Sequence, residues 1–434
     1  MTTTKLGIGS LLFTSLVSAE VHSLTLQQAL ELAARQNPEV ALARLDEQRA
    51  EQGVKVALDP FRPKVYGGSG LAYTYGYPNS IDGNAPSLIE LKTDMAIFNR
   101  PKSYQVASAR ETARGSQFGA QAKAEDVAYQ AADLFLTAST VSHESETLGQ
   151  QLPSLQKVID AMSAAVNEGS ELPLELKRAK VNLALAEERL NFSQLDLDYD
   201  EMMLAIALGY PATDRVKPID SDISATPAPP SEQEAEDMAL RNNRQLREMQ
   251  SNVLAKELEV RSFRAARLPE VNLVAQYSFF LKSNYIDYFQ KFQANNYQIG
   301  ASITIPLLVG SASKGLALQN STDMQKIRIQ MDQTHNRIVA DTRRSYEQWK
   351  KAENIRDLSR LQLDLAREEL TVLLAKNGEG QVPMSRVEQA RLEEGNRWIA
   401  LYEAEAQVTR AKLAILRQTG TLLAVLRGQA PAAP

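Results

Sequence analysis

The chain has 434 residues, of which 44% are hydrophobic and 23% charged, and its formal net charge is −5 at pH 7. This composition argues against disorder, and the lack of a basic patch argues against nucleic acid as a partner. The sequence has no cysteine and only three histidines, which lie far apart. Disulfides, thiolate metal sites and lipid attachment through an N-terminal cysteine are therefore excluded, and we expect no metal and no cofactor.

The N-terminus has the pattern of a secretory signal peptide. Lys5 supplies the positive end, residues 6–16 the apolar run, and residues 17–19 (Val-Ser-Ala) a small-residue cleavage site. A short buried helix is the alternative interpretation. Removing this segment takes away one Lys and no acid, so the mature charge becomes −6. No other stretch offers about 18 consecutive apolar residues, so we expect an exported protein that enters a membrane only as a barrel.

After the signal, the first half predicts a helix, two strands, a long helix, a turn and another helix. The helices cover about 24–57, 99–166 and 174–208, and the strands begin near residues 65 and 89. At 1.5 Å per residue the long helix measures roughly 100 Å, and the two shorter ones placed end to end measure about the same. Helices of this length do not fit within a compact domain, so their lengths favour a tubular structure.

The predicted helices carry apolar side chains at heptad spacing. A stripe every seven residues indicates coiled-coil contact with another helix, and an ordinary helix bundle is the alternative. The clearest stripes are Leu176, Leu183, Leu190, Leu197 and Leu204 in the first half, and Leu358, Leu365 and Val372 in the second.

Four segments, beginning near residues 65, 89, 271 and 297, alternate apolar or aromatic side chains with small or polar ones. A period of two predicts β-strands whose two faces meet different environments. Strands of about ten residues with one apolar and one polar face are typical of membrane β-barrels. We interpret the aromatic side chains as a membrane-interface girdle rather than a ligand-stacking site. The girdle residues are Tyr73, Tyr75, Tyr77, Phe279 and Tyr297.

The second half repeats the first. Residues 29–37 match residues 235–243 at an offset of 206, and residues 167–173 match residues 377–383 at an offset of 210. This similarity indicates two copies of one unit, joined by a segment rich in proline. We expect a signal peptide over 1–19, repeat one over 20–208, a linker over 209–231, repeat two over 232–422 and a flexible C-terminal tail over 423–434.

Four strands per chain leave two unpaired edges, which water cannot satisfy inside lipid. Closure of a barrel needs about eight strands. Two chains would supply eight strands around a lumen filled by side chains, whereas three would supply twelve around an open lumen. We expect three chains and keep the dimer as the alternative.

With these features the chain resembles the TolC-type outer-membrane efflux proteins over nearly its whole mature length. The likeness is carried by residues 29–37 with their copy from Ala235, by Leu268-Pro269, by Ile303–Leu307 leading to Gly310, and by the turns at 167–176 and 377–387. The resemblance implies a mainly α protein with a small membrane β part. It implies a trimeric α-helical barrel in the periplasm, continuous with a twelve-stranded β-barrel in the outer membrane. It also implies docking to a periplasmic adaptor and an inner-membrane pump, and no catalytic site.

In this family the turns at the tip help to close the tunnel. The likeness places Glu175 where the first turn commonly has an acid, but Arg386 stands near a position where the second turn commonly has one. Asn377 stands where an aromatic can occur. These departures put the usual gate network in doubt, so our hypothesis is a Glu175–Arg386 attraction across the tip. The alternative is that both are ordinary solvated charges.

The sequence therefore predicts a passive exit duct for efflux or type I secretion, and not an enzyme. Gly310–Gly315 lacks the register of a phosphate-binding loop, and we interpret it as a strand-to-helix corner. The negative charge predicts a lumen that favours cations. The alternatives are a soluble periplasmic coiled-coil adaptor or scaffold and, less favoured, an envelope enzyme. The substrate classes left open are drugs, siderophores, small toxins, metal ions and unfolded polypeptides.

Overall fold

The computed structural model describes residues 20–69, 87–169, 172–219, 231–280, 293–307 and 310–426. The chain divides into two compact units. The first unit comprises residues 1–41, 123–242 and 338–434, and the second comprises residues 42–122 and 243–337. The predicted signal peptide and Tyr73, Tyr75 and Tyr77 lie outside the described residues.

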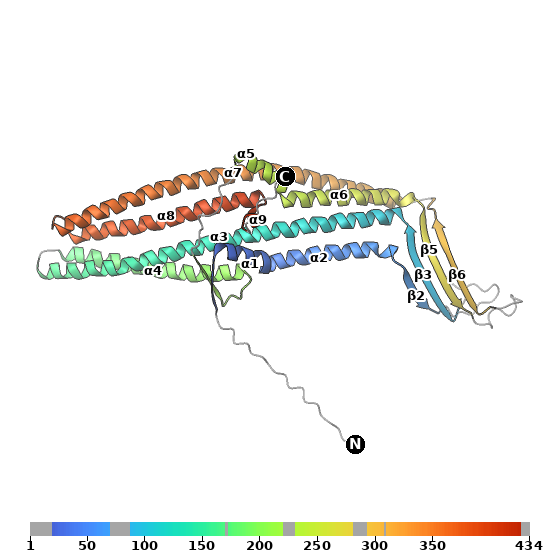
Figure 1. Cartoon of the computed structure of the whole chain (residues 1–434), viewed down its shortest axis with the longest axis horizontal. Coiled ribbons are helices and arrows are strands. Elements are labelled where there is room, and N and C mark those ends of the chain that lie inside the picture. Colours follow the sequence, from blue (N-terminus) through green and yellow to red (C-terminus); the bar gives the residue numbers. More distant parts are fainter. Residues whose placement is uncertain are drawn as a thin grey trace, which may run out of the picture. The chain divides into compact units, whose positions relative to one another are not determined.

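Two helices of 68 residues each, α3 (Arg100–Asn167) and α7 (Ser311–Gly378), contribute to both units. Figure 1 shows each of them as one continuous helix. The predicted long helices therefore end within three residues of the expected positions. Pro153 lies inside α3 without ending it.

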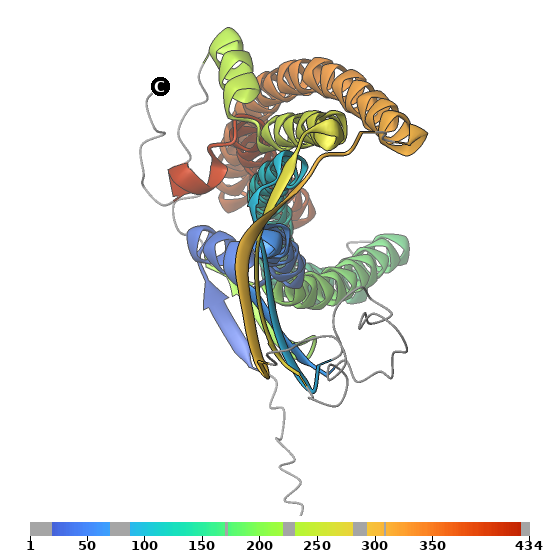
Figure 2. The same ribbon diagram turned by 90° about the vertical axis from the view of Figure 1, so that its right-hand side faces the viewer.

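The second unit contains a sheet of four antiparallel strands in the order β2-β3-β5-β6. The chain enters it through α2 (Pro38–Leu58) with the short helix η1 (Asp59–Phe61), and again through α6 (Arg244–Arg264) with η3 (Ala265–Arg267). The strands are β2 (Lys64–Gly68), β3 (Ile89–Phe98), β5 (Glu270–Phe279) and β6 (Asn295–Thr304). In Figure 2 they overlap as one thin layer.

The first unit is mostly helical. Its short strands β1 (Val21–Leu24) and β4 (Arg215–Pro218) pair in parallel. Its remaining helices are α1 (Leu26–Gln36), α4 (Pro173–Ala207), α5 (Glu232–Asn242), α8 (Met384–Gln418) and α9 (Leu422–Leu426). The core of this unit is apolar, and Phe135, Leu136 and Leu413 are fully buried in it.

The helix expected over 24–57 is divided at Asn37, a break that the sequence analysis missed. Residue 38 is proline, and a residue before proline is disfavoured in the α conformation. Asn37 adopts φ −58° and ψ 133°, and its side chain donates to the carbonyl of Ala207 at 2.8 Å and accepts from the N–H of Glu39 at 2.7 Å. The break therefore starts a new helix and ties it to the end of α4.

Corresponding helices of the two halves have equal lengths. Both α1 and α5 have 11 residues, α2 and α6 have 21, and α4 and α8 have 35. The helix α1 begins at Leu26 and α5 begins at Glu232, 206 residues later.

Some boundaries differ from those expected. The strand β4 lies within the segment predicted as a linker, and α9 extends to Leu426, beyond the predicted start of the tail. Among the described helices, none combines the length and the apolar character that a membrane span requires. The described residues also contain no group of three or more His, Asp or Glu side chains placed to hold a metal ion.

Candidate functional site: the two-faced sheet and the helical tips

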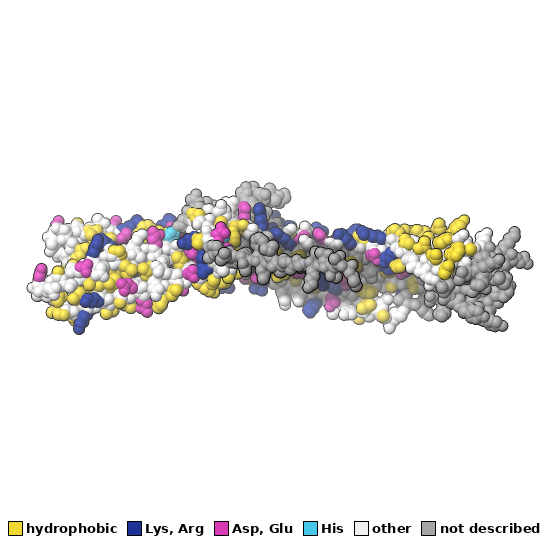
Figure 3. Space-filling view, turned by 90° about the horizontal axis from the view of Figure 1, so that it is seen from below, with side chains coloured by type: hydrophobic (Ala, Val, Ile, Leu, Met, Phe, Trp, Pro, Cys, Tyr) yellow, Lys and Arg dark blue, Asp and Glu magenta, His cyan; other side chains and the backbone are white. Residues whose placement is uncertain are grey.

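The register of the sheet gathers apolar side chains on one face. Each row across the strands takes one residue from each, and alternate rows belong to the same face because successive side chains point to opposite sides. Figure 3 shows hydrophobic side chains gathered over the strands. The apolar rows are Gly67–Leu91–Tyr277–Tyr297, Val65–Thr93–Ala275–Ile299 and Met95–Leu273–Ala301.

The intervening rows give the opposite face a polar character. They contain Gly68–Glu90–Ser278–Asn296 and Tyr66–Lys92–Gln276–Gln298. The amide of Gln276 donates to Oε1 of Glu90 at 2.7 Å and to Oγ of Ser278 at 3.2 Å. Two cations, Lys64 and Lys92, share this face with three acids, Glu90, Asp94 and Glu270, so its described charges sum to −1.

Both edges of the sheet and its apolar face lack partners within the described chain. The strands β2 and β6 each have one hydrogen-bonded neighbour. On β6 the side chain of Tyr297 is 80% exposed and that of Ile299 is 77% exposed. Helices of the second unit do not cover either face in Figures 1 and 2, as far as the described residues show. An exposed apolar patch of this kind marks a contact with a membrane or another protein.

Of the aromatic residues predicted as a girdle, the two that the structure describes, Phe279 and Tyr297, lie near one end of β5 and β6. Phe279 ends β5, and Tyr297 lies directly opposite Tyr277 on the apolar face. The hydroxyl of Tyr277 donates to Oδ1 of Asn295 at 2.7 Å. An apolar ring with a hydrogen-bonded polar tip suits a boundary between lipid and water.

Glycines with positive φ form the turns at the ends of the two helical hairpins. Gly169 follows α3 with φ +75°, and Gly380 follows α7 with φ +73°. The N–H of Gly380 donates to the carbonyl of Asn377 at 2.9 Å, and the N–H of Gln381 donates to that of Lys376 at 2.9 Å. Only glycine adopts this left-handed conformation without strain, and these bonds satisfy the last carbonyls of the helix.

The predicted gate residues lie at these turns, but their contacts within one chain differ. Glu175 lies in the first turn of α4 and accepts from Nη1 of Arg178 at 2.9 Å, rather than from Arg386. The side chain of Asn377 donates to the carbonyl of Val382 at 2.8 Å and so braces its own turn. A Glu175–Arg386 attraction across the tip stays a prediction.

The second half of the chain matches a family model described as outer membrane efflux protein, over residues 236–421. The TolC-type resemblance inferred from the sequence is thereby confirmed. No curated protein matches the sequence.

Solved structures share the fold of this chain over most of its length. The outer-membrane channel OprN is 16% identical, with a TM-score of 0.71 over 91% of this chain and 89% of that chain. The CmeC outer membrane channel of Campylobacter jejuni is 13% identical, with a TM-score of 0.73 over 92% and 86%. The outer membrane protein VceC of Vibrio cholerae is 15% identical, with a TM-score of 0.70 over 91% and 96%. At these identities the likeness establishes the fold.

A second apolar stripe on α4 was missed in the sequence analysis. The predicted stripe from Leu176 to Leu204 is half-buried or buried within the chain. Another stripe on the same helix is exposed and follows four- and three-residue steps typical of a coiled-coil seam. Counting heptads on every face of the helix would have found it. It consists of Val181, Leu185, Phe192, Leu195 and Tyr199.

A matching exposed stripe lies on α7, also in the first unit. It includes the predicted heptad residues Leu358, Leu365 and Val372, together with Ile355 and Leu361. These side chains are more than half exposed in one chain. The two stripes therefore offer apolar surface for contact with other helices.

Ionic contacts join α3 to α8 within the first unit. Nε of Arg417 donates to Oδ1 of Asp126 at 2.7 Å, and Nη1 of Arg391 donates to Oγ of Ser154 at 3.0 Å. Burial raises the pKa of Glu388, and Arg391, with Nη1 3.3 Å from Oε1, opposes this rise. Glu388 and Arg391 both lie on α8, and the bond from Arg391 to Ser154 ties this end of α8 to α3.

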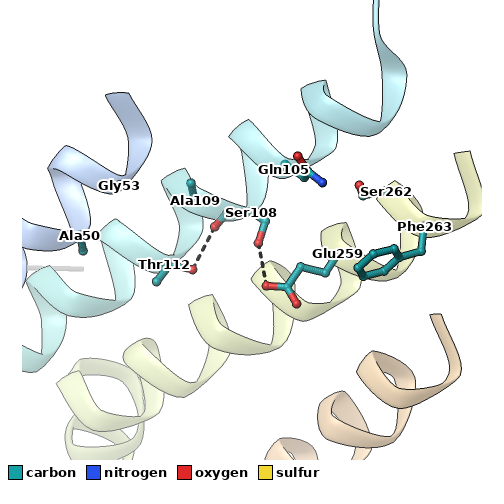
Figure 4. Close-up of a pocket in the computed structure, with 9 residues that line it drawn as sticks. All are labelled: Ala50, Gly53, Gln105, Ser108, Ala109, Thr112, Glu259, Ser262 and Phe263. Carbon is teal, nitrogen blue, oxygen red and sulfur yellow. Dashed lines mark hydrogen bonds between the residues drawn. The ribbon is translucent and has the colours of Figure 1, made fainter. Parts of the chain in front are cut away.

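A cavity of about 410 Å³ lies between α2, α3 and α6 in the second unit (Figure 4). The carboxylate of Glu259 lies on its wall and accepts from Oγ of Ser108 at 3.4 Å and from Nζ of Lys256 at 2.8 Å. The opposite wall carries the small residues Ala50 and Gly53. The carboxylate charge of Glu259 at this cavity is thus neutralised by Lys256 of the same chain. We therefore assign the cavity a packing role.

Proposed function

We propose that the protein is a passive outer-membrane exit duct, formed by three copies of the chain. The observation that carries the proposal is the four-stranded sheet, which has one apolar face, one polar face and two open edges. Lipid would cover the apolar face, and the polar face would line a water-filled lumen. Membership of the efflux protein family supports the direction of transport, from the cell outwards.

Three copies would close the wall. Twelve strands leave an open lumen, and pairing of β6 with β2 of the next copy would satisfy the two edges that lipid cannot. The helical unit supports the same assembly, because the exposed stripes on α4 and α7 need partner helices. Fully burying one such side chain contributes about 1.5–3 kcal/mol. We infer that the α4 and α7 stripes lie at contacts between copies, continuing the wall as a helical tunnel through the periplasm.

The tips would dock onto a periplasmic adaptor and an inner-membrane pump that supplies the energy. The gate would involve Glu175, Arg386 and Asn377, in part through a Glu175–Arg386 attraction between hairpins. An exposed pair contributes about 0–1 kcal/mol, so three copies bias a gate rather than lock it. Charge reversal at either position is expected to increase uptake of a large antibiotic, and unchanged uptake in both single variants would discard the attraction. Restored exclusion in the double reversal would support it.

The described charges bear on selectivity as well as on assembly. The mature charge of −6 per chain predicts a preference for cations, and the five described charges on the polar face of the sheet, two cations and three acids, have the same net sign. Conductance in planar bilayers tests this preference, and a strong anion preference contradicts it.

The alternative, a soluble periplasmic adaptor or scaffold, leaves the apolar face of the sheet without a partner. Membrane fractionation distinguishes the exit duct from the soluble adaptor or scaffold. The duct predicts a trimer in the outer-membrane fraction that only detergent releases. Extraction of the chain by high salt alone, as a monomer that stays dissolved in plain buffer, would overturn the proposed function.

A further inference from the structure

A cavity of about 510 Å³ lies where the helices of the second unit meet the sheet. It is bordered by the end of α6, by η3 and by the first turns of α7. Three cations line it, Arg264, Arg267 and Lys314, together with the hydroxyl of Ser313 and the apolar side chain of Leu318.

The three cations are exposed and form no ion pair or hydrogen bond with any described side chain. Their neighbours behave differently, since Arg261 pairs with Glu257 at 2.6 Å and Lys256 pairs with Glu259 at 2.8 Å. Three like charges around one cavity repel each other, and an anion that enters the cavity relieves this repulsion. The first turn of α7 adds its partial positive charge.

Apolar surface continues directly from this cavity. Leu318, on its wall, is 70% exposed, and Leu268 follows Arg267 in the chain and is also exposed. Ile303, Ile305 and Leu307 extend the apolar positions of β6 towards Gly310, and Leu307 is 89% exposed. Figure 3 shows Lys and Arg side chains on the helices beside the hydrophobic side chains of the strands. A ligand that fits this surface has an anionic head and long apolar chains.

We propose that the cavity binds the headgroup of an anionic phospholipid from the leaflet next to the helices, with the acyl chains along the apolar face of the sheet. The inference rests on the proposed function, because it requires the sheet to lie in a bilayer. The guanidinium groups of Arg264 and Arg267 match phosphate oxygens in a bidentate geometry, and Lys314 adds a point charge. The bound lipid would fix the depth at which the duct sits in the membrane.

The test is native mass spectrometry of the full chain, purified in an uncharged detergent and titrated with phosphatidylglycerol. Phosphatidylcholine with the same acyl chains and inorganic phosphate are titrated separately. The test variant is Arg264→Gln, Arg267→Gln and Lys314→Gln together. The matched control removes the same charges from exposed positions elsewhere on α7, with Lys326→Gln, Arg328→Gln and Arg344→Gln together.

We expect up to one tightly bound phosphatidylglycerol per chain in the natural protein and in the control. The test variant should bind it on the order of 10- to 100-fold more weakly, with phosphatidylcholine binding unchanged. If the triple variant does not assemble, each single variant should still weaken binding by about three- to tenfold.

Equal binding of phosphatidylglycerol by the test variant and the control would overturn the lipid site. Equal binding of both lipids by the natural protein, or displacement of phosphatidylglycerol by inorganic phosphate at similar concentrations, would also overturn it. The proposed duct would not be contradicted by these outcomes, because the chain could still form a trimer that requires detergent. A monomer that needs no detergent would instead contradict the proposed function.

Discussion

The two units of this chain differ in how far each completes its own contacts. The first unit has an apolar core in which Phe135, Leu136 and Leu413 are fully buried, and ion pairs join its helices. In the second unit the sheet leaves large side chains such as Tyr297 and Ile299 exposed and both edges open. A core of the first kind is stable within one chain. A sheet of the second kind depends on lipid and on neighbouring copies. The effects of substitutions in the core and in the sheet should therefore be detected by different assays.

The largest effect is expected from Phe135→Ala in the core of the first unit. Removing a fully buried ring leaves a cavity and costs about 3–5 kcal/mol. We expect a clearly lower midpoint of thermal unfolding, followed by circular dichroism at 222 nm in detergent.

The matched control for this variant is Phe192→Ala, which removes the same ring from the exposed stripe on α4. It should leave the unfolding of the single chain almost unchanged but reduce the fraction of trimer on a native gel. Similar losses of helical stability in the two variants would contradict the comparison between core and stripe.

A charge on the apolar face should affect membrane assembly rather than helical folding. Ile299→Lys introduces a cation in the middle of β6, and a cation at the midplane of a bilayer costs about 2–4 kcal/mol on the lipid face of a barrel. We expect less protein in the outer-membrane fraction. Gln298→Lys places the same charge on the polar face, one residue away, and should assemble normally. If Gln298→Lys is the more damaging variant, the faces of the sheet have been assigned the wrong way round.

A smaller effect is expected at Gly209, which ends α4 with φ +90°. A Cβ there would lie 2.7 Å from the carbonyl oxygen of Gln36, so both the conformation and the space exclude a side chain. We expect Gly209→Ala to lower the free energy of unfolding by about 1–3 kcal/mol.

Gly53, inside α2, provides the opposite case. A Cβ at this position meets nothing within 4 Å in one chain. Gly53→Ala should therefore stabilise the chain by about 0.5–1 kcal/mol, because alanine favours the helix. Urea unfolding measures both variants, and a loss of stability for Gly53→Ala would show that a neighbouring copy fills that space.

Local patterns in the sequence predicted much of the fold. Alternation with a period of two predicted β3, β5 and β6, and long runs with little proline predicted α3 and α7. These elements were predictable because each signal lies within a single element. The division at Asn37 follows from Pro38, a local signal that was passed over, whereas the pairing of β1 with β4 depends on contacts such as that of Val21 with Arg215. Such contacts leave no periodic signal in either segment.

The candidate site was predictable to a similar extent. The two faces of the sheet follow from alternation, whereas the three cations of the junction lie on α6, η3 and α7 and meet only in the folded chain. The first half has Leu58, Phe61 and Ser103 at the corresponding places, counted from the starts of α2, η1 and α3. Its nearby Lys64 pairs with Asp59, and Arg100 lies over the ring of Tyr104. The two junctions therefore share a backbone plan but differ in charge, which the resemblance alone did not predict.

The smallest effect concerns Glu248, which packs against Gly119 where α6 approaches α3. Burial raises the pKa of this carboxyl above its usual value. A carboxyl with a raised folded-state pKa contributes stability below its unfolded pKa and loses it as pH rises through the folded pKa. Glu248→Gln should therefore raise the unfolding midpoint by about 1–3 °C at pH 7 and have little effect at pH 4. The control is Glu257→Gln, which breaks an exposed pair with Arg261 and should change the midpoint little at either pH. A stabilisation by Glu248→Gln that is the same at both pH values would show that packing, and not the buried charge, limits this helix contact.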